Sequence, residues 1–340
     1  MKALQISQPG EIRLIDVATP EIKPGEVLIK INYVGFCGSD LNTYRGKNPM
    51  AQLPVIPGHE IGATIEKIGA GVPPVIREQM PCTVMPYSSC GKCTACRNRR
   101  PNACQYNQTF GVQRNGAMTE YLSVPWEKVI IDPENKISPK YFALVEPLSI
   151  GVHAIARAEV TNLDFVLIAG CGMIGIGALA RAVAAGAKVI AMDVDDQKLA
   201  LAKGLGAAYT VNAMTENVHD RLQKITNQNG PDVVIEAVGI PSTYQIAVNE
   251  AAFTGRVVCL GFAKTEIALE TKHFVQKELD IRGSRNASPD DFRLAMEYMK
   301  KGIYPLDELI SGIYKPEEAQ SVMENWSANP GKVFKLIIEF

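Results

Sequence analysis

The fold is decided by residues 165–175, which read FVLIAGCGMIG. The first six are an apolar run of strand length, and the Ala-rich stretch Ile174–Ala185 has the composition of a helix. Gly170, Gly172 and Gly175 form G-x-G-x-x-G at the junction. Between a strand and a helix, such glycines allow a tight turn, close approach of a pyrophosphate and close helix packing. The stretch therefore predicts a dinucleotide-binding site; the alternative is that the glycines serve only the turn.

The end of the next predicted strand indicates which dinucleotide binds. Asp193 ends the strand Lys188–Asp193, where a carboxylate accepts hydrogen bonds from the adenosine ribose and repels the 2'-phosphate of NADP. The residues 194–196 supply no arginine to offset that charge. NAD is therefore expected rather than NADP. The predicted cofactor-binding residues are Gly170, Gly172, Met173, Ile174, Gly175, Asp193 and Arg285.

The same pattern of strand and helix continues along the chain. Gln197–Ala207 is helical in composition, and Asp232–Gly239 and Arg256–Phe262 are further apolar runs of strand length. Strands that alternate with helices predict a parallel sheet covered on both faces, an α/β arrangement.

Residues 1–150 have a different sequence pattern, which predicts short strands interrupted by glycine and proline. Val27–Gly35, Glu60–Gly69 and Met118–Val124 are predicted as half-buried strands. After residue 285, a helix-like stretch at Asp291–Gly302 leads to a last strand at Lys332–Phe340. We predict a β-rich domain over 1–150, a dinucleotide-binding domain over 151–285, and a tail over 286–340 that returns to the first domain.

Composition limits the possible functions. With 46% hydrophobic residues the chain can bury a core, and 35 Lys and Arg against 36 Asp and Glu give a net charge of -1. This balance gives no reason to expect nucleic acid or an anionic membrane as a partner. The start, MKALQISQPG, lacks the apolar stretch of a signal peptide, and no run is long enough to span a membrane. A cytoplasmic protein is expected.

Four of the eight cysteines lie within fifteen residues. Cys90, Cys93, Cys96 and Cys104 have the spacing C-x2-C-x2-C-x7-C in a polar, basic segment. Four thiolates so close along the chain can surround one tetrahedral zinc ion, which then has no open position for a substrate. The cluster predicts a structural zinc site; an iron-sulfur cluster or free thiols are the alternatives.

A second set of possible ligands is spread along the first domain. Cys37 lies in GFCGSD, His59 and Glu60 in PGHE, and Glu146 in ALVEP. A catalytic zinc takes about three protein ligands and keeps an open position, which a cysteine, a histidine and a carboxylate suit. Each residue alone also has an ordinary explanation as a core cysteine, a turn histidine or a surface carboxylate.

The order of these motifs resembles that in the zinc-containing medium-chain alcohol dehydrogenases. GFCGSD, PGHE, the four cysteines, EPLSIGVHA and GCGMIG follow one another as they do in that family, and the resemblance runs from Met1 to Phe340. Glu146 stands where classical members have cysteine, as in the polyol branch that includes sorbitol and threonine dehydrogenases. The resemblance implies a GroES-like catalytic domain, a Rossmann domain and an active site in the cleft between them.

The resemblance also assigns roles. It implies Cys37, His59 and Glu60 as ligands of a catalytic zinc, with Glu146 a ligand or a water-linked neighbour, and two zinc ions per chain. Zinc would lower the pKa of the alcohol, whose carbinol hydrogen then leaves as hydride to NAD. Ser39, if it is more than a turn residue, would pass the alcohol proton on. Asn42 stands where several polyol relatives have a relay histidine.

The substrate depends on residues near the nicotinamide. Residues 282–292, RGSRNASPDDF, resemble the same stretch in dehydrogenases of sugar acids, including one acting at C5 of L-galactonate. Arg285 would pair with a substrate carboxylate, or else brace the domain junction. Gln113 and Arg114 are further cleft candidates, unless they belong to a surface loop. A sugar acid such as L-galactonate or L-gulonate is therefore expected, with a neutral polyol such as sorbitol, or L-threonine, as alternatives.

Other classes remain as alternatives. A zinc-free reductase of the same superfamily would lack the Cys37 and His59 pair and the four cysteines, and a catalytically silent scaffold would not need an open zinc site. A homodimer or homotetramer is expected by resemblance, joined through an edge strand near Arg256–Phe262 and the segment after it.

Overall fold

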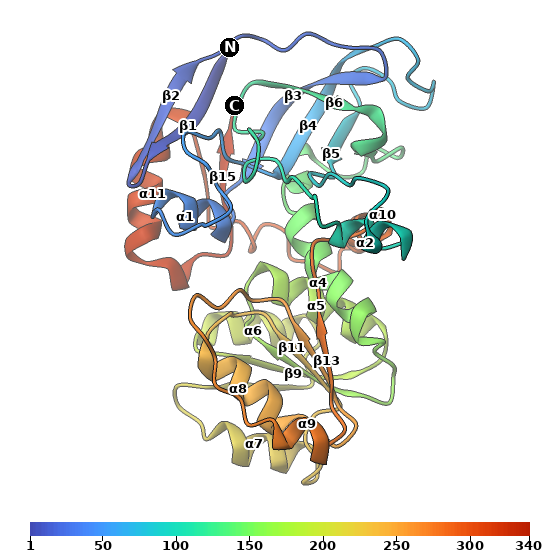
Figure 1. The fold of residues 1–340 in the computed structure, drawn as a ribbon, viewed down its shortest axis with the longest axis vertical. Coiled ribbons are helices and arrows are strands. Elements are labelled where there is room, and N and C mark those ends of the chain that lie inside the picture. Colours follow the sequence, from blue (N-terminus) through green and yellow to red (C-terminus); the bar gives the residue numbers. More distant parts are fainter. The chain divides into compact units, whose positions relative to one another are not determined.

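A computed structural model describes all 340 residues, except the side chain of Lys332. The chain divides into two compact units. Unit 1 contains Met1–Glu146 and Ser288–Phe340, and unit 2 contains Pro147–Ala287. The divisions thus lie after Glu146 and Ala287, where the sequence suggested residues 150 and 285. Both chain ends belong to unit 1 (Figure 1).

Unit 1 is built on β-structure. Its strands are β1 (Lys2–Gln8), β2 (Glu11–Asp16), β3 (Glu26–Gly35), β4 (Glu60–Ile68), β5 (Pro81–Val84), β6 (Tyr121–Pro125), β7 (Val129–Ile131), β14 (Gly312–Tyr314) and β15 (Leu336–Glu339). β1 and β2 form an antiparallel pair. The others form a seven-stranded sheet in the order β14-β15-β3-β4-β5-β7, with β6 also paired to β3 (Figure 1).

The C-terminal tail completes the large sheet. β15 pairs antiparallel with β3, with Ile337 opposite Gly35, and β14 pairs parallel with β15. Short helices surround this sheet: α1 (Gly38–Tyr44), α2 (Thr94–Arg97), α3 (Pro139–Phe142), α10 (Pro289–Lys300) and α11 (Ala319–Ala328). The buried apolar side chains of β3 and β4 pack with those of β1 and α11 in one core.

Unit 2 is a doubly wound sheet. Its six parallel strands are β8 (Phe165–Ala169), β9 (Lys188–Asp193), β10 (Tyr209–Asn212), β11 (Val233–Glu236), β12 (Arg256–Cys259) and β13 (Asp280–Gly283). Their order is β10-β9-β8-β11-β12-β13. This order reverses direction between β8 and β11, which is where such sheets bind nucleotides.

Both faces of the parallel sheet are covered, as the apolar strands predict. Val166 and Ile168 face a core shared with α4 (Val145–Ala158), α5 (Met173–Ala184) and α6 (Asp196–Gly204). Leu167 and Ala169, which alternate with them, face a second core. That core includes residues of α7 (Val218–Ile225) and α8 (Pro241–Glu250), and α9 (Lys272–Gln276) precedes β13.

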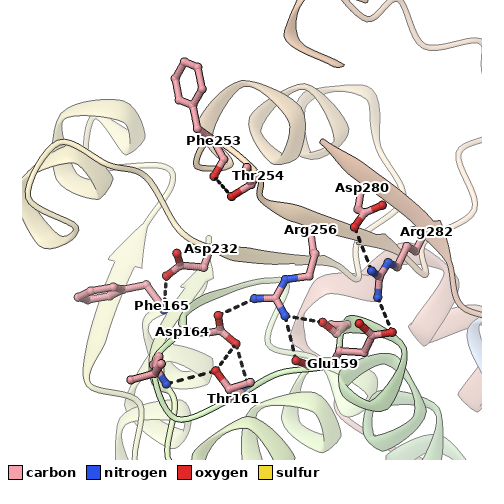
Figure 2. A network of polar contacts seen from close by, with 12 residues as sticks. Glu159, Thr161, Asp164, Phe165, Asp232, Phe253, Thr254, Arg256, Asp280 and Arg282 are labelled. Atoms are coloured by element: carbon pink, nitrogen blue, oxygen red, sulfur yellow. Dashed lines mark hydrogen bonds and ion pairs between the residues drawn. The ribbon is translucent and has the colours of Figure 1, made fainter. Parts of the chain in front are cut away.

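Ionic contacts connect the amino ends of β12 and β13 to the end of α4 (Figure 2). Arg256 donates to the carbonyl oxygens of Ala158 and Glu159, both at 2.9 Å, and to Asp164 at 2.5 Å. Arg282 lies 3.0 Å from Asp280 and 3.1 Å from Glu159. These bonds satisfy carbonyl groups where the helix ends.

One expectation about assembly is corrected by the strand order. Arg256–Cys259 is hydrogen-bonded on both sides, to β11 and to β13, so it is not an edge strand. The edge next to it is β13, which belongs to the segment after it. Within the described residues, no helix has the length and apolar character needed to cross a bilayer.

Candidate functional site

Strand pairing brings together three possible ligands that lie up to 23 residues apart in sequence. β3 ends at Gly35 opposite Glu60, the first residue of β4. Cys37 is the N-cap residue of α1 just after β3, and His59 directly precedes β4. One ligand atom from each of Cys37, His59 and Glu60 lies within 4.8 Å of the others. These residues form the candidate metal centre.

The chemistry of the candidate metal centre suits a cation. Nδ1 of His59 is buried and has no hydrogen-bond partner among the described residues. Burial disfavours the charged imidazole, but Cys37, Asp40 and Glu146 outweigh burial and raise the pKa of His59 well above its ordinary value. Anionic groups around a buried imidazole are the setting that a divalent metal ion neutralises. The residues present therefore fit a zinc ion.

Glu60 forms a buried ion pair with Lys335. The Nζ atom of Lys335, at the start of the last strand region, lies 2.5 Å from both carboxylate oxygens of Glu60 and donates to the carbonyl of Phe36 at 3.0 Å. Both side chains are buried. Burial raises the pKa of Glu60 to about 7, although Lys335 and His59 oppose that shift. Lys335 is thus the buried positive charge next to the candidate metal centre.

Glu146 has a different partner. It lies in the first turn of α4, outside the 4.8 Å group, and its buried carboxylate accepts a hydrogen bond from the hydroxyl of Tyr87. Glu146 is still near enough to raise the pKa of Glu60. Burial, with Glu146, raises the pKa of Tyr87 well above its ordinary value, so the phenol stays a donor. Phe292 meets the Tyr87 ring edge-on at 6.4 Å between centroids.

Ser39 lies in the first turn of α1, two residues after Cys37. Its Oγ atom is buried and makes no hydrogen bond to any described residue. Its carbonyl accepts from the hydroxyl of Thr43 at 2.9 Å. The hydroxyl of Ser39 is therefore available to another group. Asn42 lies one turn further along α1.

The four clustered cysteines converge as the spacing predicts. Cys93 Sγ lies 3.5 Å from Cys96 Sγ and 3.8 Å from Cys104 Sγ, and one sulfur from each of the four residues falls within 4.8 Å of the others. The described cysteines are all free thiols. Four sulfurs at Zn–S bonds of about 2.3 Å would be separated by about 3.8 Å, much more than a disulfide bond of about 2.05 Å.

Backbone amides point at these sulfurs. The N–H groups of Cys90 and Tyr106 donate to Cys104 Sγ at 3.3 Å, and that of Cys93 donates to Cys90 Sγ at 3.3 Å. Amides of Cys96 and Gln105 lower the pKa of Cys93 to about 6. Such bonds favour thiolates, which are the form that binds metal. The cluster fits a closed four-sulfur metal site.

The glycine motif has the geometry that its spacing predicts. Gly170 has φ +96°, and a Cβ atom on Gly175 would lie 1.8 Å from the carbonyl oxygen of Gly170. Gly172 is the N-cap residue of α5, and a Cβ atom there would meet nothing within 4 Å. Met173 and Ile174 form the first turn of α5, which has no side-chain cap. Its free N–H groups and helix dipole suit a pyrophosphate.

Asp193 stands at the carboxyl end of β9, beside this turn. Its carboxylate accepts from the backbone N–H of Cys171 at 2.7 Å and from that of Val194 at 2.8 Å. These bonds hold the side chain at the start of the glycine turn, where a carboxylate oxygen has a further lone pair for a ribose hydroxyl.

Arg285 lies just after β13 and lines a pocket of about 620 Å³ in unit 2. Ser284, Phe262 and Tyr244 line the same pocket, at the carboxyl ends of β12 and β13. Gln113 lies in unit 1, where its side chain accepts from the N–H of Thr109 at 2.8 Å and donates to the sulfur of Met50. These substrate candidates are thus in separate units.

Two side chains next to the candidate metal centre escaped the sequence analysis, Lys335 and Tyr87. Lys335 lies 275 positions from Glu60, so no local motif connects them. A lysine within the apolar run VFKLII was the available signal, because a buried ammonium requires an anionic partner. Tyr87 had no such signal.

Known proteins resemble the chain over both units. Residues 23–134 match the alcohol dehydrogenase GroES-like domain, and residues 174–301 match the zinc-binding dehydrogenase family. The D-arabitol-phosphate dehydrogenase of Enterococcus avium is 32% identical over 345 aligned positions, which cover 100% of this chain and 97% of that protein. The L-galactonate-5-dehydrogenase of Escherichia coli is 32% identical, covering 100% and 99%.

Solved structures agree with the fold. An alcohol dehydrogenase of Escherichia coli complexed with NADH has a TM-score of 0.91 at 28% identity, covering 100% of this chain and 99% of that chain. A protein of Sinorhizobium meliloti bound to NADP has a TM-score of 0.90 at 29% identity, with the same coverage.

Proposed function

The chain belongs to the zinc-containing medium-chain alcohol dehydrogenases of the polyol branch, and on that premise we propose that it oxidises a secondary alcohol of a sugar acid with NAD. The family makes it an oxidoreductase of CH–OH groups, with a GroES-like unit and a Rossmann unit. The observation that carries the proposal is the group of half-buried Cys37 and buried His59 and Glu60, whose ligand atoms converge.

Cys37, His59 and Glu60 would hold the catalytic zinc, with Glu146 as a fourth ligand or a water-linked neighbour. A zinc ion bound there supplies Lewis acidity that favours the alkoxide form of the alcohol. Cys90, Cys93, Cys96 and Cys104 would hold the structural zinc. Lys335 keeps Glu60 in place through its two 2.5 Å contacts.

The proton of the alcohol needs a path out of the site. Ser39 would accept it at Oγ, which is buried and has no partner among the described residues. Since Asn42 stands where a histidine would extend the path, the cofactor ribose or water would take the proton from Ser39. We propose that five residues form the reactive group of the enzyme: Cys37, Ser39, His59, Glu60 and Glu146.

NAD would bind through the glycine turn at Gly170, Gly172 and Gly175 and the first N–H groups of α5, at Met173 and Ile174. Asp193 supports NAD over NADP, because its charge would lie next to a 2'-phosphate. One solved relative binds NADH and another binds NADP, and the assay below compares NAD with NADP directly.

A sugar acid is favoured by Arg285, whose guanidinium can bind a carboxylate bidentately. Arg285 lines a pocket at the carboxyl ends of β12 and β13, the edge at which ligands bind in sheets of this kind. The resemblance of residues 282–292 to sugar-acid enzymes supports the same choice.

The test is NADH formation by the zinc-loaded protein with L-galactonate, L-gulonate, L-idonate, sorbitol, galactitol and L-threonine, with NADP in parallel. Turnover restricted to the three sugar acids is expected, with NAD preferred. Turnover of sorbitol or galactitol alone would replace the sugar acid by a neutral polyol. No NADH from any of the six alcohols, with two zinc ions and NAD bound, would leave the reaction class standing and contradict only the choice of alcohol, whereas a single bound zinc ion would favour a silent scaffold.

We also propose a homodimer or homotetramer that pairs through β13. Ile281 in β13 and Val275 and Phe262 near it are exposed apolar side chains. Light scattering on the eluting protein tests this, and a monomeric mass at micromolar concentration would contradict it.

A further inference from the structure

Arg114 is a half-buried cation that forms no ion pair with any carboxylate of the described residues. Its guanidinium stacks on the ring of Phe110 at 3.8 Å, and its Nε atom is buried with no hydrogen-bond partner among the described residues. Burial lowers its pKa, and no carboxylate offsets that shift. An arginine in this position is prepared to bind an oxyanion, since it loses little further hydration when the anion arrives.

The turn that carries Arg114 is packed against the candidate metal centre. A Cβ atom on Gly111 would lie 2.4 Å from the backbone nitrogen of Gly58, and one on Gly116 would lie 2.3 Å from the carbonyl oxygen of Gly58. The N–H of Gly111 also donates to the carbonyl of Arg114 at 2.8 Å, which closes the turn. Because Gly58 directly precedes His59, these contacts fix Arg114 relative to a candidate metal ligand.

A second connection runs through Tyr87. The N–H of Phe110 donates to the carbonyl of Pro86 at 3.1 Å, so the ring under Arg114 is fixed beside Tyr87. The hydroxyl of Tyr87 donates to Glu146, which is near enough to the candidate metal centre to raise the pKa of Glu60. Lys128 donates to the carbonyl of Tyr87 at 2.7 Å, and Arg114 is near enough to lower the pKa of Lys128. Two cations, Arg114 and Lys128, therefore lie close to each other, and Lys128 contacts the residue that bonds to Glu146.

The surrounding chain is positively charged. Residues 79–119 contain no aspartate or glutamate, and their five basic residues are Lys92, Arg97, Arg99, Arg100 and Arg114. Among them Arg114 is the one packed on an aromatic ring. A positive potential of this kind attracts anionic ligands.

Resting on the proposed function, we infer that Arg114, with Lys128 beside it, binds the oxyanion at the end of the substrate remote from the reacting alcohol. The oxyanion is a carboxylate or a phosphate monoester on a polyol chain. The charged end of the substrate then binds in unit 1. Binding of the same group by Arg285 is the alternative, and it would place the charged end in unit 2. Gly111, Gly116 and Phe110 act as positioning residues for the guanidinium.

The experiment compares anionic and neutral alcohols of the same skeleton: L-galactonate with galactitol, and D-arabitol phosphate with D-arabitol. Wild type, Arg114→Met, Arg114→Lys and Arg285→Ala are assayed with saturating NAD. Arg100→Met is the matched control, because its exposed arginine lies in the same acid-free segment. Calorimetric binding of D-arabitol phosphate and L-galactonate to each zinc-loaded protein gives a readout that needs no turnover.

Arg114→Met should lower kcat/KM for the anionic member of a pair about tenfold to a hundredfold, the range for loss of a charge-assisted hydrogen bond. The neutral member and the Arg100→Met control should change by less than about threefold. Arg114→Lys should recover part of the loss. Whichever pair responds decides between carboxylate and phosphate.

If Arg114→Met loses activity equally on anionic and neutral alcohols, Arg114 is only structural. If Arg114→Met leaves the anionic kinetics unchanged and Arg285→Ala lowers them, the oxyanion binds in unit 2. If wild type oxidises none of these four alcohols and none of the sugar acids in the substrate screen, the proposed function fails. Calorimetry then still decides the inference: anion binding that Arg114→Met abolishes would support it, and anion binding that is absent or unchanged would overturn it.

Discussion

Replacing Lys335 by methionine should destabilise unit 1 in a pH-dependent way. Lys335 is the cation that contacts both oxygens of buried Glu60, and methionine keeps its length without its charge. Removing one partner of a buried ion pair costs about 3–5 kcal/mol, because the other charge is left buried without compensation. We expect a loss of about 3 kcal/mol in the free energy of unfolding at pH 8.5.

The direction of this pH dependence follows from the ionisation of Glu60. Its pKa in the folded protein is raised to about 7 from 4.5, so its protonated form stabilises the fold at low pH and that contribution is lost as pH rises from about 4.5 through 7. Without Lys335 the pKa rises further, so the deficit of the variant should grow with pH. At pH 5.5 Glu60 is mainly protonated in both proteins, and the deficit should fall below about 1 kcal/mol.

Urea unfolding followed by tryptophan fluorescence suits this measurement, because both tryptophans, Trp126 and Trp326, belong to unit 1. Chelator-treated protein is used, since a bound cation would itself offset the charge of Glu60. Lys315→Met is the matched control: Lys315 pairs with Glu339 at 2.8 Å in an exposed position, where loss of the pair should change the free energy of unfolding little. A deficit of Lys335→Met that matches this control at pH 8.5, or that is the same at both pH values, would show that Lys335 does not compensate the buried charge of Glu60.

Three further changes test other parts of the structure. Gly175→Ala should abolish NAD binding in a fluorescence titration, because its Cβ would lie 1.8 Å from the carbonyl oxygen of Gly170. Gly204→Ala, with open space around its Cβ, is the control and should bind NAD normally. Equal NAD affinities of the two variants would contradict this prediction. Cys90→Ser should reduce bound zinc by one ion per chain in elemental analysis. An unchanged zinc content would contradict a zinc site at the four cysteines. Arg256→Met should cost unit 2 about 2–4 kcal/mol in chemical unfolding followed by circular dichroism, since it loses Asp164 and two carbonyl partners; a change within about 0.5 kcal/mol would contradict that estimate.

The sequence was most informative where chemistry is local. Lys188–Asp193 was predicted as a strand and is β9, and the helix expected over Ile174–Ala185 is α5 at Met173–Ala184. The family, the fold class and the zinc and dinucleotide chemistry followed from short motifs whose spacing allows few other uses. The predicted strand Met118–Val124 begins later, at Tyr121, because residues 116–118 bond to the turn before β4 instead.

The sequence was least informative where contacts join distant segments. Lys335 meets Glu60 only because β15 pairs with β3, and a single sequence does not reveal which strands pair. The expected edge near Arg256–Phe262 was wrong for the same reason: β13 adds to the sheet outside β12. The partner of Glu146 was equally hidden, since Tyr87 is 59 positions away.

Cys37→Ser tests whether Cys37, His59 and Glu60 hold a catalytic metal. Zinc content and NADH formation are measured side by side for wild type and the variant with the best alcohol from the substrate screen. We expect two zinc ions per chain and NADH formation for wild type, and one zinc ion and no NADH for a folded Cys37→Ser. If the variant keeps both zinc ions and its activity, Cys37 is not a ligand of a catalytic zinc.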